Sequence, residues 1–194
     1  MLLIGLGHKA RQGKNTAALG LLEAAPISID ARLYAYATAL RQEVRSACIR
    51  FGHAAALIES FKEAGLMPEW VRDEAGKQRT LYQWWGTDYR RKQDPDYWVK
   101  RLFAQVKKDA PDLAIVTDVR FPNEAESIKS AGGVLIKVIR TTPPDLIVPA
   151  HPSEDALNGY TGWDYTLEAA TVTELKRKSH TLYLEIEKRV GYGG

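Results

Sequence analysis

The chain has 194 residues, of which 45% are hydrophobic and 26% charged, as in ordinary soluble globular proteins. This length predicts one domain, or one domain with an insertion, and the single cysteine, Cys48, excludes an intramolecular disulfide scaffold. No apolar run approaches the roughly 20 residues that cross a bilayer, and Lys9 and Arg11 follow the first apolar run too closely for a signal peptide, so we expect a cytoplasmic protein without a membrane partner. With 27 basic and 24 acidic side chains, the net charge of +3 suits a phosphate-bearing ligand without requiring nucleic acid.

The first third of the chain alternates between strand and helix patterns. An apolar run predicts a buried strand at residues 1–6, and an Ala- and Leu-rich segment that stops before a proline predicts a helix over 13–25. A second short strand is expected at 27–30. Apolar residues at steps of three or four predict an amphipathic helix over 32–51, and another helix is expected over 54–66.

The remainder continues this alternation after a charged, aromatic stretch. We expect one or two helical turns at 80–85, helices over 97–108, 123–131 and 172–189, and strands at 113–117, 134–139 and 165–167. Continuously apolar strands that alternate with helices predict an α/β fold with a parallel sheet covered on both faces. Residues 52–93 interrupt the core elements and are the expected lid or insertion.

A glycine-rich loop between the first strand and the first helix has the composition of a phosphate-binding loop. Gly13 and Lys14 match the end of the G-x-x-x-x-G-K-[ST] pattern, but His8 occupies the place of its first glycine and Asn15 that of its hydroxyl, with Thr16 one place late. Backbone N–H groups at a helix N-terminus favour anions, and lysine adds positive charge. The residues expected to contact the phosphates are Gly7, His8, Lys9, Ala10, Arg11, Gln12, Gly13, Lys14, Asn15 and Thr16.

Two other interpretations of this loop compete. Gly5, Gly7 and Ala10 also spell G-x-G-x-x-A, with Asp30 about 20 residues on, as a dinucleotide site would have. That interpretation places Gly13 inside the first turns of a helix that must pack tightly on the sheet, which disfavours it. The second alternative is a simple glycine turn. We favour phosphate binding.

Charged residues follow two of the predicted strands. Asp118 and Arg120 come directly after 113–117, where ligands bind in open parallel sheets; the aspartate could hold Mg²⁺ together with Thr16, and the arginine could clamp a phosphoryl oxygen. The alternative is a surface pair that caps the next helix. Asp30 ends the predicted second strand and could be a general base, a metal-associated carboxylate or a helix N-cap.

Aromatic and cationic side chains gather at residues 83–92. Trp84 and Trp85 could stack on a base, and Arg90 and Arg91 could stabilise charge on a phosphoryl group when a lid closes. The alternative is that the tryptophans belong to a core and the cations are solvated, which we favour for Lys92.

Six blocks that span nearly the whole chain carry a further signal when they are taken together. They are residues 13–16, 30–34, 83–88, 97–99, 117–125 and 151–154. The most specific are the Gly-Thr-Asp…Tyr-Trp-Val and Asp-Val-Arg-Phe-Pro-Asn-Glu blocks. In this order and spacing the blocks resemble the phage-type deoxynucleoside monophosphate kinases.

This resemblance implies a three-layer P-loop kinase fold with a helical lid, which transfers the γ-phosphoryl group of ATP, with Mg²⁺, to a deoxynucleoside 5′-monophosphate. It further implies a nucleotide-metabolism enzyme in the cytoplasm of an infected bacterium, with homodimers common in the family. By matching position, Lys14, Thr16, Asp118 and Arg120 would serve ATP and the metal. The residues implied on the acceptor side are Asp30, Trp84, Trp85, Thr87, Asp88, Arg90, Arg91, His151 and Glu154.

The chain departs from the family pattern in two places. Asn15 replaces an expected aspartate, and Glu168-Ala-Ala-Thr171 replaces an expected Asn-Gly turn beside the base. Two rival functions stay open: a related kinase with a hydroxyl acceptor, such as a hydroxymethylated base in DNA, which needs a general base such as Asp30, and a nucleotide-binding module without catalysis.

Overall fold

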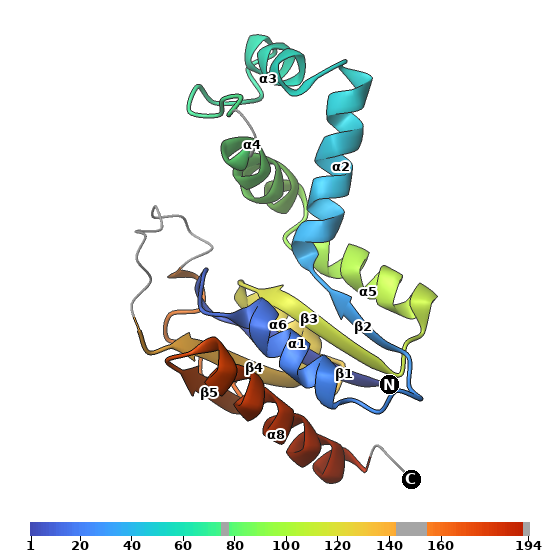
Figure 1. Ribbon diagram of the computed structural model, residues 1–194. Helices are drawn as coiled ribbons and strands as arrows, with labels where there is room; N and C mark the ends of the chain where they lie inside the picture. The colour runs from blue at the N-terminus through green and yellow to red at the C-terminus, as the bar shows by residue number, and fades with distance from the viewer. Residues whose placement is uncertain (75–77, 143–154, 192–194) are drawn as a thin grey trace. The chain divides into compact units, whose positions relative to one another are not determined.

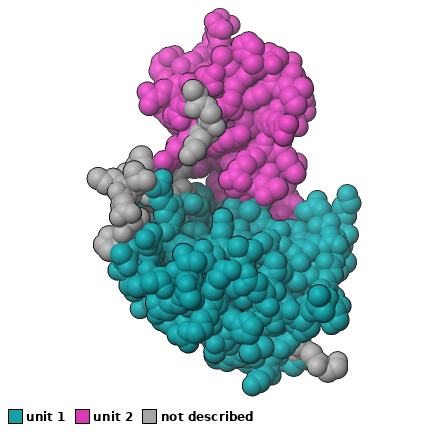
Figure 2. Space-filling model, viewed as in Figure 1, with its two compact units in different colours: residues 1–35, 103–194 teal, residues 36–102 magenta. Residues whose placement is uncertain are grey.

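The computed structural model describes residues 1–74, 78–142 and 155–191, which form two compact units. The first consists of Met1–Ala35 with Phe103–Gly194, and the second of Tyr36–Leu102 (Figure 2). The expected insertion at 52–93 lies inside the second unit, which begins earlier and ends later. Within the described ranges, no helix combines the length and the apolar character that crossing a membrane requires.

The first unit is built on a five-stranded parallel sheet, counted over the described residues (Figure 1). Its strand order is β2-β3-β1-β4-β5, with the first strand of the chain in the centre. The strands are β1 (Leu2–Gly7), β2 (Ala31–Tyr34), β3 (Leu113–Val119), β4 (Val134–Arg140) and β5 (Tyr165–Ala169). The predicted α/β parallel sheet is confirmed, and the architecture is consistent with a P-loop kinase fold.

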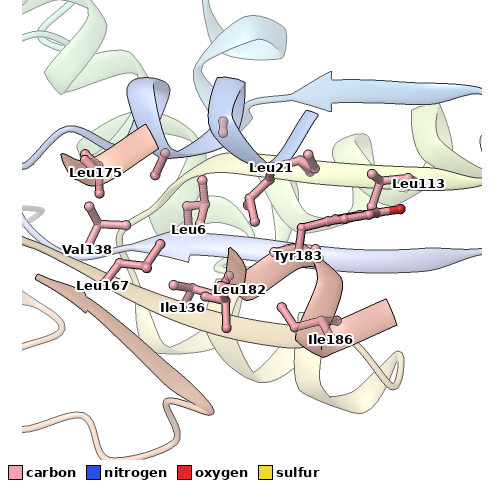
Figure 3. Packing of buried hydrophobic residues seen from close by; sticks show 14 of the residues in the cluster. Leu6, Leu21, Leu113, Ile136, Val138, Leu167, Leu175, Leu182, Tyr183 and Ile186 are labelled. Carbon is pink, nitrogen blue, oxygen red and sulfur yellow. The ribbon is translucent and has the colours of Figure 1, made fainter. Parts of the chain in front are cut away.

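Alternate residues of β1 face two different layers of helices. Leu6 packs into a core with α1 (Lys14–Ala24) and α8 (Val172–Val190), where Leu21 and Tyr183 are fully buried (Figure 3). On the opposite face, a Cβ at Gly5 would lie 2.6 Å from Cδ1 of Ile128 in α6 (Pro122–Ser130). The sheet therefore has helices on both faces, as predicted, and its apolar strands are buried between them.

The second unit is helical and has an aromatic core. It contains α2 (Tyr36–Arg50), α3 (Ala54–Glu63), α4 (Arg79–Gln83), the π-helix η1 (Trp84–Arg91) and the start of α5 (Tyr97–Asp109). Phe61 contacts the rings of Trp84, Trp85 and Tyr89, with ring centroids about 6 Å apart. The sequence predicted helical turns at 80–85 but not the π-helix that follows them.

One predicted strand is wrong. Residues 26–29 form a turn in which Ile29 N donates to Pro26 O at 3.2 Å, and Ile27 is fully exposed. The strand is instead β2, which begins directly after the predicted one, and the helix predicted from residue 32 begins at Tyr36. The alternating isoleucines resemble a strand, but Pro26 supports the turn, and the ladder to β3 begins only at Ala31.

Candidate active site

The glycine-rich loop lies at the carboxyl edge of the sheet, between β1 and α1. The chain leaves β1 toward the helical layer of α1 and leaves the neighbouring β3 toward α6 on the other face. Such a divergence between adjacent strands is the switch point at which open α/β sheets bind ligands. The loop and the end of β3 therefore share the edge that the sequence predicted for a site.

Lys14, the first residue of α1, turns its side chain back into the loop. Nζ donates to the backbone carbonyl of His8 at 2.9 Å and to that of Lys9, and the residue is only 7% exposed. Burying an ammonium group is costly unless hydrogen bonds compensate for the lost water. The loop thus holds a positive charge at a helix N-terminus, where the free N–H groups and the helix dipole favour an anion.

The loop backbone contains three residues with positive φ: His8 (104°), Arg11 (59°) and Gly13 (93°). Successive N–H groups in turns of this kind form concave anion-binding surfaces. Gln12 ties the loop to the sheet, because its Oε1 accepts a hydrogen bond from the Arg140 backbone N at 2.7 Å. Gly13 is the N-cap of α1, which removes the dinucleotide interpretation, since that required Gly13 inside the helix.

Gly7 is needed for close packing rather than for its φ angle. A Cβ at this position would lie 2.5 Å from Cη2 of Trp163, whose ring lies against the start of the loop. The Trp163 ring also packs edge-on against Tyr160, with centroids 5.3 Å apart. Sequence reasoning did not find Trp163, because nothing local distinguishes a tryptophan that packs on a loop about 150 residues earlier in the chain.

A β-bulge brings the predicted Asp118 and Arg120 to the end of β3. Gly5 pairs with Val116 but Gly7 pairs with Val119, so β3 carries one extra residue beside the loop. Bulges re-aim side chains and occur next to active sites. The strand runs to Val119, two residues further than predicted, so Asp118 is the last but one residue of the strand and does not follow it.

Glu124 organises the turn that carries Arg120. Its buried carboxylate accepts hydrogen bonds from the backbone N of Arg120 at 2.7 Å and of Phe121 at 3.1 Å, at the start of α6. A glutamate at the third helical position is a typical cap, here preceded by Pro122 at the first. The Pro-Asn-Glu run therefore has a structural role, because Glu124 holds the backbone of Arg120 in place through these hydrogen bonds.

Asp30 does not lie at this edge, and its predicted position is wrong. It immediately precedes β2, and its backbone N donates to Oδ2 of Asp112, the residue before β3, at 2.9 Å. Both residues are at the amino ends of parallel strands, the opposite edge of the sheet from the loop. The Asp30 carboxylate pairs instead with Arg32 at 2.7 Å, which through this hydrogen bond holds the pKa of Asp30 below its usual value.

In the second unit, the two tryptophans predicted to stack on a base are core residues. Trp84 is 2% and Trp85 4% exposed, and Trp84 stacks on Tyr89 at 5.1 Å with an interplanar angle of 19°. Their faces are thus covered by aromatic neighbours. The core alternative considered from the sequence is the one that the structure supports.

Arg90 is held within its own unit by Glu43 of α2, a residue that the sequence did not single out. Glu43 Oε1 accepts from Arg90 Nε at 2.5 Å and from Trp85 Nε1 at 2.9 Å, and Oε2 accepts from the Tyr97 hydroxyl at 2.6 Å. The guanidinium also lies 5.0 Å from the centroid of the Tyr97 ring and 5.1 Å from that of Tyr89. Burial would raise the pKa of Glu43, but the hydrogen bonds from Tyr97, Trp85 and Arg90 outweigh it and lower that pKa.

The other residues predicted on the acceptor side lie on or beside η1. Arg91 donates to the backbone carbonyl of Pro95 at 3.2 Å, and Asp88 pairs with the exposed Lys92 at 3.7 Å; Thr87 is half-buried. His151 and Glu154 lie outside the described residues. Arg90, which the sequence predicted to stabilise phosphoryl charge when a lid closes, pairs with Glu43 in the structure, and that catalytic role stays a prediction.

The described residues contain no group of three or more His, Cys, Asp or Glu side chains that could hold a metal ion. Oxygens at the carboxyl edge include the half-buried hydroxyl of Thr16, in the first turn of α1, and the carboxylate of Asp118. One or two such ligands suit Mg²⁺, which keeps waters and takes its other ligands from substrate phosphates. The donor set thus fits Mg²⁺ carried in with a nucleotide.

A comparison with known proteins points to the same family as the motifs. Among curated proteins, the chain matches the deoxynucleoside-5′-monophosphate kinase of Escherichia phage T5. The two are 32% identical over 107 residues, which cover 52% of this chain and 41% of the phage enzyme. The match therefore spans less than half the length of that relative and supports a distant relationship to a nucleotide kinase. No protein-family profile matches the chain.

Proposed function

We propose that the protein is a nucleotide kinase that transfers the γ-phosphoryl group of ATP to a deoxynucleoside 5′-monophosphate. The observation that carries this proposal is the buried Lys14, folded into a glycine loop at the junction of the central strand and its helix. The name of the phage T5 relative supports the acceptor class. Neither the loop nor the sheet by itself distinguishes this acceptor from others.

The loop residues would act by binding and positioning. An incoming triphosphate would take the place of the His8 and Lys9 carbonyls as the partner of Lys14, while the N–H groups of the first turn of α1 hold its oxygens. Arg120, fixed by the Glu124 cap, would add positive charge where phosphoryl transfer spreads charge over the oxygens. Thr16 and Asp118 would hold Mg²⁺, which would supply positive charge to the phosphate oxygens when bound.

The acceptor phosphate is itself an anion at neutral pH and needs no strong base, so positioning can supply most of the catalysis. This distinguishes the proposal from the hydroxyl-acceptor alternative, which requires a general base. The base considered for that alternative, Asp30, pairs with Arg32 at the amino edge of the sheet, which argues against it. Thr87, Asp88 and Arg91 remain assigned to acceptor binding by the family resemblance alone.

A substrate screen tests the proposal. Purified protein with ATP and Mg²⁺ is incubated separately with each deoxy- and ribonucleoside 5′-monophosphate, and ADP release is measured by a coupled assay. We expect turnover with at least one deoxynucleoside monophosphate and none with DNA bearing hydroxymethylated bases. ATP binding without turnover on any acceptor would instead identify a non-catalytic nucleotide-binding module.

A further inference from the structure

His8 combines two features that a simple glycine turn does not need. It has φ of 104°, a conformation that L-residues rarely adopt, at the position where the phosphate-loop pattern has glycine. Its Nδ1 is buried and has no hydrogen-bond partner among the described residues. Backbone strain and an unsatisfied buried polar atom both cost free energy and typically mark functional positions.

The charged groups around His8 come from three elements and are of one sign. Lys9 lies in the loop itself, Lys14 begins α1, and Lys137 lies on β4 in register with Gly7. Burial and then the charges of Lys137, Lys9 and Lys14 lower the pKa of His8, against a hydrogen bond to the Val138 backbone that raises it. Asp155 pairs with Lys9 at 3.5 Å and partly offsets the charge of that lysine, but the charged groups that act on the pKa of His8 are the three lysines.

We propose, on the basis of the function proposed above, that His8 takes up a proton from solvent when the triphosphate of ATP binds and then pairs as an imidazolium with the bound anion. In the free loop, protonation would place a fourth positive charge beside three lysines and leave a buried N–H without an acceptor. A polyanion reverses both effects, because it neutralises the lysines and supplies acceptor oxygens. His8 is thus a further phosphate-binding residue, whose charge depends on the ligand.

Thermodynamic linkage between proton and ATP binding predicts the direction and the size of the pH dependence of the Kd for ATP. If ATP raises the pKa of His8, then ATP must bind more tightly to protein in which His8 is protonated, so its Kd falls as pH is lowered through the pKa of the bound state. A rise of about one unit corresponds to an about tenfold difference in Kd between low and high pH. The effect is lost when the imidazole is removed.

The experiment is an NMR titration of the histidine ring protons, with and without ATP, in the wild type, His8→Gly and His180→Gln. Glycine tolerates the positive φ of position 8, so the His8→Gly variant should fold, and it assigns the His8 resonance; His180, exposed on α8, is the matched control. Calorimetric Kd values for ATP from pH 5.5 to 8 accompany it. We expect the pKa of His8 to rise by about one unit on ATP binding, and His8→Gly to lose the pH dependence that His180→Gln keeps.

Three outcomes would overturn the inference. ATP that binds without moving the pKa of His8 would refute it and leave the proposed function intact. Loss of ATP binding in His8→Gly at pH 8, where the imidazole is neutral, would also refute the inference and leave the proposed function intact. In that case His8 would act through the loop conformation and not through its charge. Failure of the wild type to bind ATP at any pH would refute the proposed function, and the inference with it.

Discussion

Replacement of Glu43 by alanine should destabilise the helical unit by about 3 kcal/mol. Its carboxylate accepts hydrogen bonds from Trp85, Arg90 and Tyr97, and the Glu43 and Arg90 side chains are only 14% and 26% exposed. A lost hydrogen bond costs about 1 kcal/mol, and about 1.5–3 kcal/mol where one group is charged. Because the charged carboxylate makes all three bonds, the lower value sums to about 4.5 kcal/mol, and water that reaches the partly exposed Arg90 reduces the cost to about 3 kcal/mol. Glu43→Gln keeps the volume and one acceptor oxygen and should cost about half as much.

Urea denaturation followed by tryptophan fluorescence measures this effect, because Trp70, Trp84, Trp85 and Trp98 all lie in residues 36–102. The control is Glu59→Ala, an exposed glutamate on α3, which should change the free energy of unfolding by less than about 0.5 kcal/mol. An unchanged midpoint for Glu43→Ala would refute the argument that this carboxylate organises the unit.

The same network predicts a pH dependence. Since the pKa of Glu43 is lowered in the folded protein, its contribution is fully present above the unfolded value of 4.5 and is lost as pH falls through the folded value. The wild type should therefore lose more stability than Glu43→Gln on acidification from pH 6 to pH 3. Equal losses in the two proteins would show that the carboxylate titrates normally.

Three further substitutions test other parts of the account. Asp30→Asn removes a carboxylate at the far edge of the sheet from the loop, so kcat on the best acceptor should change by less than about twofold, whereas a loss of orders of magnitude would return Asp30 to the site. Gly7→Ala places a methyl group against the Trp163 ring and should abolish ATP binding in calorimetry while circular dichroism stays near wild type; unimpaired binding would show that this contact does not shape the loop. His53→Ala removes the side-chain acceptor for Ala56 N at the start of α3, 3.0 Å away, and should cost about 1 kcal/mol in urea denaturation, which an unchanged midpoint would contradict.

The sequence predicted the sheet well because buried parallel strands are continuously apolar. β1, β3 and β4 were found within a few residues of their bounds, and only the edge strand β2, partly exposed on both faces, was misplaced. Pattern and propensity do not identify an exposed four-residue strand when a neighbouring Ile-Ser-Ile turn alternates in the same way. That error moved Asp30 from one edge of the sheet to the other.

The candidate site was predictable only where its residues are local in sequence. The loop from Gly7 to Thr16 carries its own signal, and so does Asp118 after an apolar strand. Glu43 and Trp163, in contrast, matter through contacts with residues 42 or more positions away, to which no spacing rule applies. Trp85 was ambiguous for the same reason: tryptophans at a core and at a base-stacking site look alike until their neighbours are known.

The most direct test of the central claim compares the wild type with Lys14→Ala, using Lys107→Ala, an exposed lysine on α5, as the matched control. ATP affinity is measured by calorimetry, and turnover with the best deoxynucleoside monophosphate by ADP release. The account predicts that Lys14→Ala stays folded but loses turnover by at least about a hundredfold, while Lys107→Ala matches the wild type. Wild-type affinity and turnover in Lys14→Ala would contradict the assignment of this loop to the phosphates of ATP.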